Sequence, residues 1–279
     1  MSWKAFEVVF RLRTPLHSGW RKVGNLLMTR PYVTGRMLWG ALTMRLTRNE
    51  AGDEAATDSG RYEKTGELVH EKLAFTYFYP ALKAKSGFEV NWPWEGEADF
   101  RRRFLGGYAG TALNRSGHAA AEGTLHEVEF ISPHTIDDGK QVYLAGYIFE
   151  RGDCRLNWRS ALRRIQFGGE RGYGWGAVEP LGSPNETDCL RLFGNVSFKG
   201  SGDRPLLSLE ADARLLAHTA ADPNLHAEGE IEPLVGREWR TKHVGQDVGF
   251  SGVCFVPGSK LSGKGKFQVG RLGIWKAEG

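Results

Sequence analysis

The chain has 279 residues, 41% of them hydrophobic, and no run near the roughly 18 apolar residues of a membrane span, so we expect a globular cytoplasmic protein without membrane contact. Its three cysteines lie far apart and form no CxxC pair, which argues against a disulfide framework or a zinc site. The net charge of +4 is unevenly spread, because residues 1–48 hold nine Lys or Arg against one acid, and this arginine-rich bias suits contact with phosphate groups.

The first elements in chain order are a strand, a polar loop and a helix. Residues 6–12 alternate as a strand does, and Thr14-Pro15 ends the pattern. A polar loop over residues 17–25 follows. Residues 36–46 show near-helical spacing of Leu and Met, with Thr34 as the N-cap. Residues 49–70 are acidic and rich in turn-forming residues, which predicts a connection or insertion.

Strands are predicted next at residues 73–79, 124–131 and 141–149, separated by loops or insertions over residues 84–123. A short helix at residues 158–166 leads into a glycine-rich segment, and a strand begins at Ala177. This order predicts an α+β protein with a ferredoxin-like (RRM-type) βαββαβ unit over residues 1–190. Residues 191–279 hold further strand-like pieces, which suit either a degenerate second ferredoxin-like half or added strands.

The glycine loop, residues 168–176, has five glycines in nine positions. Glycine permits positive φ angles and close backbone approach, so such a loop can present successive amides to a phosphate chain. Arg171, Tyr173 and Trp175 add charge and stacking surface, a pairing that suits single-stranded RNA. The loop lacks the GK[ST] ending of a nucleotide-binding P-loop. A purely structural glycine hairpin is the alternative.

Three further stretches accompany this loop: Thr14-Pro15-Leu16-His17-Ser18-Gly19, residues 32–42, which open the predicted helix, and residues 112–130. Together with the glycine loop they resemble, in the same order, the TPLhiG turn, the IPGSSLRGAL helix start, the aidRxTgxAxxGxLyxxE segment and the GGxRxxGxG loop of the RAMP superfamily of CRISPR proteins. The resemblance covers about residues 1–180.

Within that superfamily the chain looks most like the family-five subunit of type III-D and type VII-like effector complexes. The resemblance implies a non-catalytic subunit without cofactor or metal, which binds the 5′ handle of crRNA and caps a backbone of family-seven-type subunits. A large or nuclease subunit is a further partner that it suggests, and target RNA would be met only indirectly.

The resemblance and the charge pattern together select a set of candidate RNA-binding residues. They are His17, Ser18, Arg21, Lys22, Arg36, Trp39, Arg45, Arg115, Arg163, Arg164, Gly168, Gly169, Arg171, Gly172, Tyr173, Gly174 and Trp175.

Other functions stay open at this stage. A related RAMP endoribonuclease would use a histidine as general acid/base, and His17 lies in a suitable loop. A backbone-type RAMP subunit would line the guide–target duplex and could cleave RNA with a loop aspartate, for which Asp99, Asp137 and Asp138 qualify only by residue type. A scaffold that contacts mainly protein is another alternative. Trp92 and Trp94 could wedge between bases, although packing within their own loop is favoured.

Overall fold

The computed structural model describes residues 2–52, 57–114, 116–186, 191–240 and 243–278. Its central layer is an antiparallel sheet in which β11 (Tyr143–Arg151) lies between β1 (Trp3–Leu12) and β5 (Tyr79–Lys83). On the other side of β1 lies β12 (Val178–Pro180), and the opposite edge is β6 (Phe88–Val90). Two shorter strands join the same sheet: β4 (Leu73–Phe75) pairs with β11, and β13 (Asn185–Glu186) pairs with β1.

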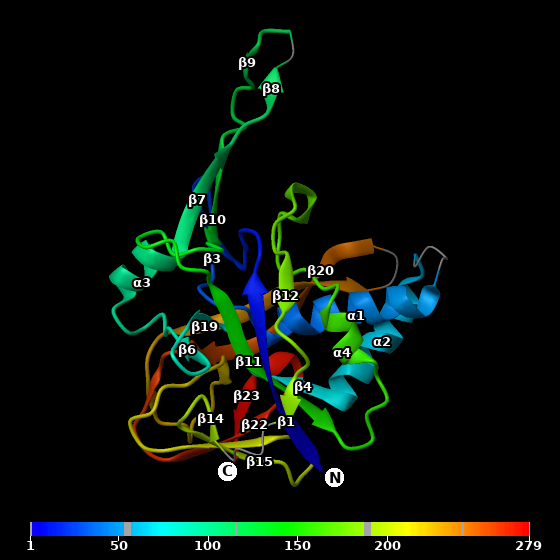
Figure 1. The fold of residues 1–279 in the computed structure, drawn as a ribbon, viewed down its shortest axis with the longest axis vertical. Helices are drawn as coiled ribbons and strands as arrows, with labels where there is room; N and C mark the ends of the chain where they lie inside the picture. Colours follow the sequence, from blue (N-terminus) through cyan, green and yellow to red (C-terminus); the bar gives the residue numbers. More distant parts are fainter. Residues whose placement is uncertain (1, 53–56, 115, 187–190, 241–242, 279) are drawn as a thin grey trace.

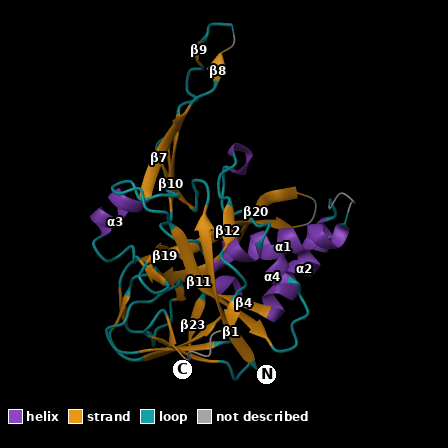
Figure 2. Cartoon of the chain, in the orientation of Figure 1, coloured by secondary structure: helices purple, strands orange, loops and turns teal. Residues whose placement is uncertain are grey.

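Three helices cover one face of this sheet: α1 (Gly35–Ala51), α2 (Ser59–Lys72) and α4 (Trp158–Leu162). Figure 2 shows them gathered on one side of the molecule. The Thr34 side chain caps α1 by accepting a hydrogen bond from the Met37 amide, as predicted. The strand order β12-β1-β11-β4/β5, with antiparallel neighbours and helices after the first and third strands of the unit, is that of a ferredoxin-like βαββαβ unit.

The second face of the central sheet packs on a sheet built from the C-terminal part of the chain. Alternation along β1 sends Phe6, Val8 and Phe10 toward the helices, and Trp3 and Ala5 toward this sheet. Its eight strands are β14 (Arg191–Leu192), β15 (Val196–Lys199), β16 (Leu206–Leu209), β17 (Thr219–Ala220), β19 (Ile231–Arg240), β20 (His243–Phe255), β22 (Gly265–Val269) and β23 (Trp275–Ala277).

A small ladder of β18 (Ala227–Glu228) and β21 (Lys260–Leu261), and the 3-10 turn η2 (Arg271–Gly273), complete the C-terminal part. The described residues from 191 onward contain no α-helix, so this part consists of added strands and is not a second βαββαβ half. The predicted boundary at residue 190 falls outside the described residues.

A third sheet projects from the body (Figure 1). It comprises β2 (Gly19–Val23), β3 (Leu26–Thr29), β10 (His126–Ile131) and β7 (Leu105–Gly110), and the chain between β7 and β10 carries a two-stranded tip of β8 (Leu113–Asn114) and β9 (Ala119–Ala120). Helix α3 (Glu97–Phe104) precedes β7. None of the helices of the described residues is long and apolar enough to cross a membrane.

Three segments that were expected to be loops, or loops and insertions, contain regular secondary structure. Residues 17–25 contain β2 and the turn that leads to β3, and residues 84–123 contain β6, α3 and β7. Residues 49–70 include the end of α1 and most of α2. Helix α2 was missed because its buried face consists of Tyr62, Thr65, Gly66, Val69 and His70, whose composition does not mark an apolar stripe.

Candidate nucleic-acid interface

The glycine loop is hydrogen-bonded to the turn that follows β1. The Gly169 amide donates to the His17 carbonyl (3.0 Å), and the Gly176 amide donates to the Pro15 carbonyl (2.7 Å). The Thr14 hydroxyl donates to the Gly174 carbonyl (3.0 Å) and accepts from the Ala177 amide (2.9 Å). Two stretches that lie about 150 residues apart in the sequence therefore form one unit.

Glycine is required at both ends of this loop for reasons of space. A Cβ on Gly168 would lie 2.2 Å from the His17 carbonyl oxygen, and one on Gly176 would lie 1.8 Å from the Phe167 carbonyl oxygen. Both residues also have φ between 75° and 78°. In contrast, a Cβ on Gly172 at the loop tip would meet nothing within 4 Å.

The loop can offer fewer amides to phosphate than its composition suggests. The amides of Gly169 and of residues 173–176 already donate to carbonyl groups of the loop or of the neighbouring turn. Three consecutive amides, those of Glu170, Arg171 and Gly172, have no acceptor within the described part of the chain. Such a run at an exposed tip can bind one phosphate.

His17 contacts the glycine loop, whereas Ser18 forms hydrogen bonds with Thr29 and Arg30 at the end of β3. His17 is 8% exposed, and its Nδ1 donates to the Glu129 carbonyl at 2.7 Å, which links the turn to β10 and makes Nε2 the acceptor of the neutral ring. Ser18 is 1% exposed. The Ser18 side chain therefore offers almost no surface to a ligand, and the small exposed fraction of His17 favours a role in positioning the loop. Contact of either residue with RNA stays a prediction.

Four arginines gather where the glycine loop meets the helices: Arg45 and Arg48 on α1, Arg164 after α4, and Arg171 in the loop. We refer to them as the arginine cluster. Arg171 is held in place because its Nε donates to the Gly168 carbonyl (2.9 Å) and its Nη1 contacts the Met44 sulfur (3.4 Å). Within the described residues none of the four forms an ion pair with an acid.

The electrostatics of the arginine cluster agree with this geometry. Burial, together with the positive charges of Arg164 and Arg48, lowers the pKa of Arg45, and burial together with Arg48 lowers the pKa of Arg171. Such mutual repulsion is relieved when an anion binds. Arg48 is not among the predicted RNA-binding residues. Its position one helical turn after Arg45 indicates that both arginines lie on the same face of α1.

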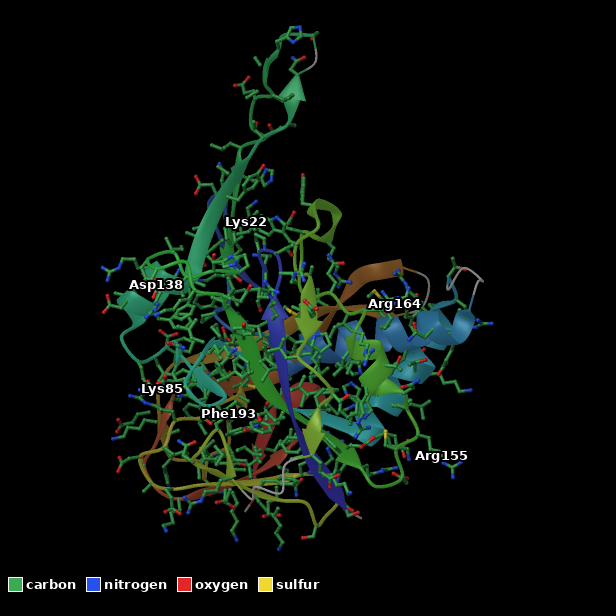
Figure 3. The ribbon with its side chains drawn as sticks, viewed as in Figure 1. Lys22, Lys85, Asp138, Arg155, Arg164 and Phe193 are labelled. Atoms are coloured by element: carbon green, nitrogen blue, oxygen red, sulfur yellow. The ribbon has the colours of Figure 1, made fainter. Side chains whose placement is uncertain are left out.

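The surface around the cluster carries further predicted residues. Tyr173 stands at the loop tip with 72% of its surface exposed, and Arg163 and Lys22 are exposed as well. Arg21 stacks on the Trp20 ring, with 4.0 Å from its guanidinium carbon to the ring centre. Figure 3 places Arg164 beside α1 and Lys22 near the base of the projecting β7–β10 hairpin, whereas Arg155 lies at the opposite end of the helical layer.

Other predicted residues serve packing. The half-buried Trp39 ring stacks on His70 at 4.7 Å, and its Nε1 donates to the Gly66 carbonyl, so it joins α1 to α2. Arg36 points toward the C-terminal sheet, where its Nη2 donates to the Ser251 hydroxyl (2.8 Å). Trp175 is half-buried edge-on against Phe130, at 5.1 Å between ring centres.

Arg115 lies outside the described residues. Gly172 and Gly174 are exposed at the loop tip, and their contact with RNA stays a prediction.

The residues named for the alternative functions form contacts within the chain. Asp99 pairs with Arg102, and both Asp137 and Asp138 pair with Arg103, which suits surface and turn roles. Trp92 and Trp94 stack on each other (5.1 Å) and pack against Tyr79, as favoured over a wedge. Among the described residues, no three His, Cys, Asp or Glu side chains lie close enough together to hold a metal ion.

No protein-family model matches the chain, and neither does any curated protein. Among solved structures, the chain is similar to a chain of the type III-B Cmr-beta bound to cognate target RNA and AMPPnP, with 12% identity over 91% of this chain and 85% of the other, and a TM-score of 0.49. Two further similarities are to chains of the type III-B Cmr-beta in the apo state (10% identity, 64% of this chain and 96% of the other, TM-score 0.41) and bound to cognate target RNA (11%, 63% and 96%, TM-score 0.40). The ferredoxin-like assignment rests on the strand order of this chain.

Proposed function

We propose that this protein is a non-catalytic RNA-binding subunit of a CRISPR effector complex, which holds the 5′ handle of crRNA and caps a row of backbone subunits. One observation carries the proposal: three of the stretches that resemble RAMP motifs meet at the glycine loop, and the helix that the fourth stretch opens contacts the loop one turn further on. The Thr14–Gly19 turn bonds to the loop, His17 bonds to the Glu129 carbonyl, and Arg171 contacts Met44 of α1.

RNA suits this surface better than another anion does. The arginine cluster has no described acidic partner, the three available amides lie next to Arg171, and the exposed Tyr173 ring offers a stacking surface. Phosphate contacts supply affinity, and stacking accepts an unpaired base. A duplex would present its bases less readily to Tyr173 than a single strand such as a guide handle.

The absence of chemistry is part of the proposal. A general acid/base must reach the reacting 2′-hydroxyl, whereas His17 is 8% exposed and one of its ring nitrogens is engaged with the Glu129 carbonyl. We expect the purified chain to leave repeat RNA intact. Cleavage of repeat RNA that His17→Ala abolishes would favour the endoribonuclease instead.

Binding of a guide RNA by the purified chain tests the proposal, measured by fluorescence anisotropy at several salt concentrations. We expect Arg171→Ala to weaken binding and to lower the slope of log K against log salt by about 1, because one phosphate contact is lost. Tyr173→Ala should weaken binding without changing the slope, because it removes stacking worth about 1–3 kcal/mol.

Arg155→Ala is the matched control, since Arg155 is exposed and distant from the loop in Figure 3. Equal effects of Arg155→Ala and Arg171→Ala would mean that the RNA binds the chain without using the glycine loop.

A further inference from the structure

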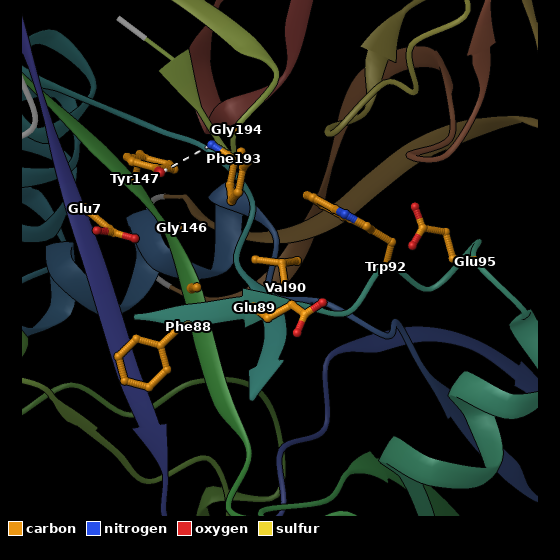
Figure 4. A pocket seen from close by; sticks show the side chains of 11 residues that line it. Glu7, Phe88, Glu89, Val90, Trp92, Glu95, Gly146, Tyr147, Phe193 and Gly194 are labelled. Atoms are coloured by element: carbon orange, nitrogen blue, oxygen red, sulfur yellow. Dashed lines mark hydrogen bonds between the residues drawn. The ribbon is translucent and has the colours of Figure 1, made fainter. Parts of the chain in front are cut away.

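A second site lies on the face of the central sheet that the helices do not cover. A cavity of about 430 Å³ opens between β1, β11 and edge strand β6 on one side and the β14–β15 turn on the other (Figure 4). Four aromatic side chains line it: Phe88, Trp92, Tyr147 and Phe193. We call this cavity the aromatic pocket.

The aromatic walls are fixed by their mutual packing. The Tyr147 and Phe193 rings meet edge-to-face at 4.8 Å, and Phe193 meets Trp92 at 5.6 Å. The Phe193 amide also donates to the Tyr147 hydroxyl at 3.3 Å, the contact drawn in Figure 4. Rings held in this way offer preformed surfaces on which a flat or cationic group can pack.

The charge of the aromatic pocket is entirely negative. Glu7, Glu89 and Glu95 line it, and no Lys, Arg or His does. None of these three carboxylates forms an ion pair or a side-chain hydrogen bond with another described residue, whereas the acids Glu129, Glu150 and Glu232 are all paired with arginine. RNA phosphates would be repelled here, and a cation would be attracted.

The central sheet ends beside the pocket, and within the described part of the chain no further strand pairs with this edge. Strand β6 is the last strand of the central sheet and pairs only with β5 in the described part of the chain. Its three residues, Phe88, Glu89 and Val90, all line the pocket. An extended segment added alongside β6 would therefore bring one of its side chains over the cavity.

We propose that the aromatic pocket receives an arginine side chain from another protein, carried on an extended segment that pairs with β6. A guanidinium group stacks on aromatic faces and bonds carboxylates through its planar fork, so it matches both components of the lining better than an ammonium group does. This site is independent of RNA binding and lies on a different surface from the glycine loop.

The test uses the whole chain and blocked five-residue peptides, Ac-Gly-Val-Arg-Val-Gly-NH2 and its versions with lysine or glutamate in place of arginine, in isothermal titration calorimetry. We expect saturable binding of the arginine peptide, weaker binding of the lysine peptide and none of the glutamate peptide. The double change Glu7→Gln with Glu95→Gln should weaken binding of the arginine peptide at least tenfold.

Glu63→Gln, a change at an exposed acid on α2, is the matched control and should leave peptide binding unchanged. Circular dichroism and guide-RNA affinity should be unchanged in the double variant, which separates this proposal from the proposed function. The proposal is overturned if the arginine peptide does not bind, if the double variant binds it equally well, or if spermidine binds as tightly, which would indicate a small-cation site.

Discussion

Arg30 is an almost fully buried cation at the junction of the central sheet and the C-terminal sheet. Its Nη1 donates to Glu232 Oε1 at 2.6 Å, and the same carboxylate accepts from His218 Nε2 and from Trp20 Nε1. Although burial opposes ionisation, these hydrogen bonds lower the pKa of Glu232 to about 2. His218 is neutral here, because burial and the nearby Arg30 lower its pKa despite its bond to Glu232.

Replacing Glu232 by Gln should therefore be costly. The change leaves the Arg30 charge buried without a counter-charge, and we expect a loss of about 3 kcal/mol in the free energy of unfolding, measured by urea titration. Glu186→Gln breaks the exposed Lys4–Glu186 pair and should cost less than about 1 kcal/mol. Equal losses in the two variants would contradict this assignment.

His70, whose ring stacks on Trp39 between helices α1 and α2, is a buried histidine. Burial, with the charges of Arg271, Arg204 and Arg36, lowers the pKa of His70 from 6.5 to about 3. The unfolded chain therefore takes up a proton near pH 6.5 that the folded chain excludes, and folding is weakened as the pH falls below that value.

We expect His70 to contribute a loss of about 2 kcal/mol between pH 7 and pH 5, seen as a falling Tm. His70→Phe keeps a ring against Trp39 and should flatten this part of the pH profile. A profile with the same slope in His70→Phe would assign the acid sensitivity to another group, with His218 the next candidate.

Within the glycine loop, the structure divides the glycines into two kinds. Gly176→Ala forces a Cβ against the Phe167 carbonyl at a positive φ angle, so we expect a loss of about 2–4 kcal/mol in unfolding free energy. Gly172→Ala adds a methyl group in open space and should change stability by less than about 0.5 kcal/mol. Thermal unfolding of both variants distinguishes them, and similar stabilities would contradict the close packing on the turn.

The sequence predicts elements well where residue types and spacing agree. Alternation along β1 and the Thr34 cap of α1 identify both elements, and the glycine loop is recognised by composition alone. Strand β7, which reads Leu-Gly-Gly-Tyr-Ala-Gly, is equally rich in glycine and is not recognised as a strand from its sequence. Its pairing with β10, and not its own propensity, makes it a strand. The arginine cluster forms because α1, α4 and the glycine loop meet in space. The sequence alone does not show this meeting, so it does not identify Arg48 as a member.

At the scale of the whole molecule, opposite charges occupy separate surfaces. The arginine cluster and Tyr173 lie in the glycine loop and on the helices beside it, whereas the aromatic pocket with its three glutamates opens on the uncovered face of the central sheet. A net charge of +4 alone does not reveal this separation. Under the two proposals, such a distribution would steer RNA toward one surface and leave the other for protein contacts.

Crosslinking of guide RNA to the chain by ultraviolet light, followed by mass spectrometry of the peptides, tests the central claim most directly. The account predicts RNA adducts on the peptide that contains Tyr173, lost in Tyr173→Leu, and none on the peptide that contains Trp92. Adducts that spare the glycine loop, or that concentrate at the aromatic pocket, would contradict it.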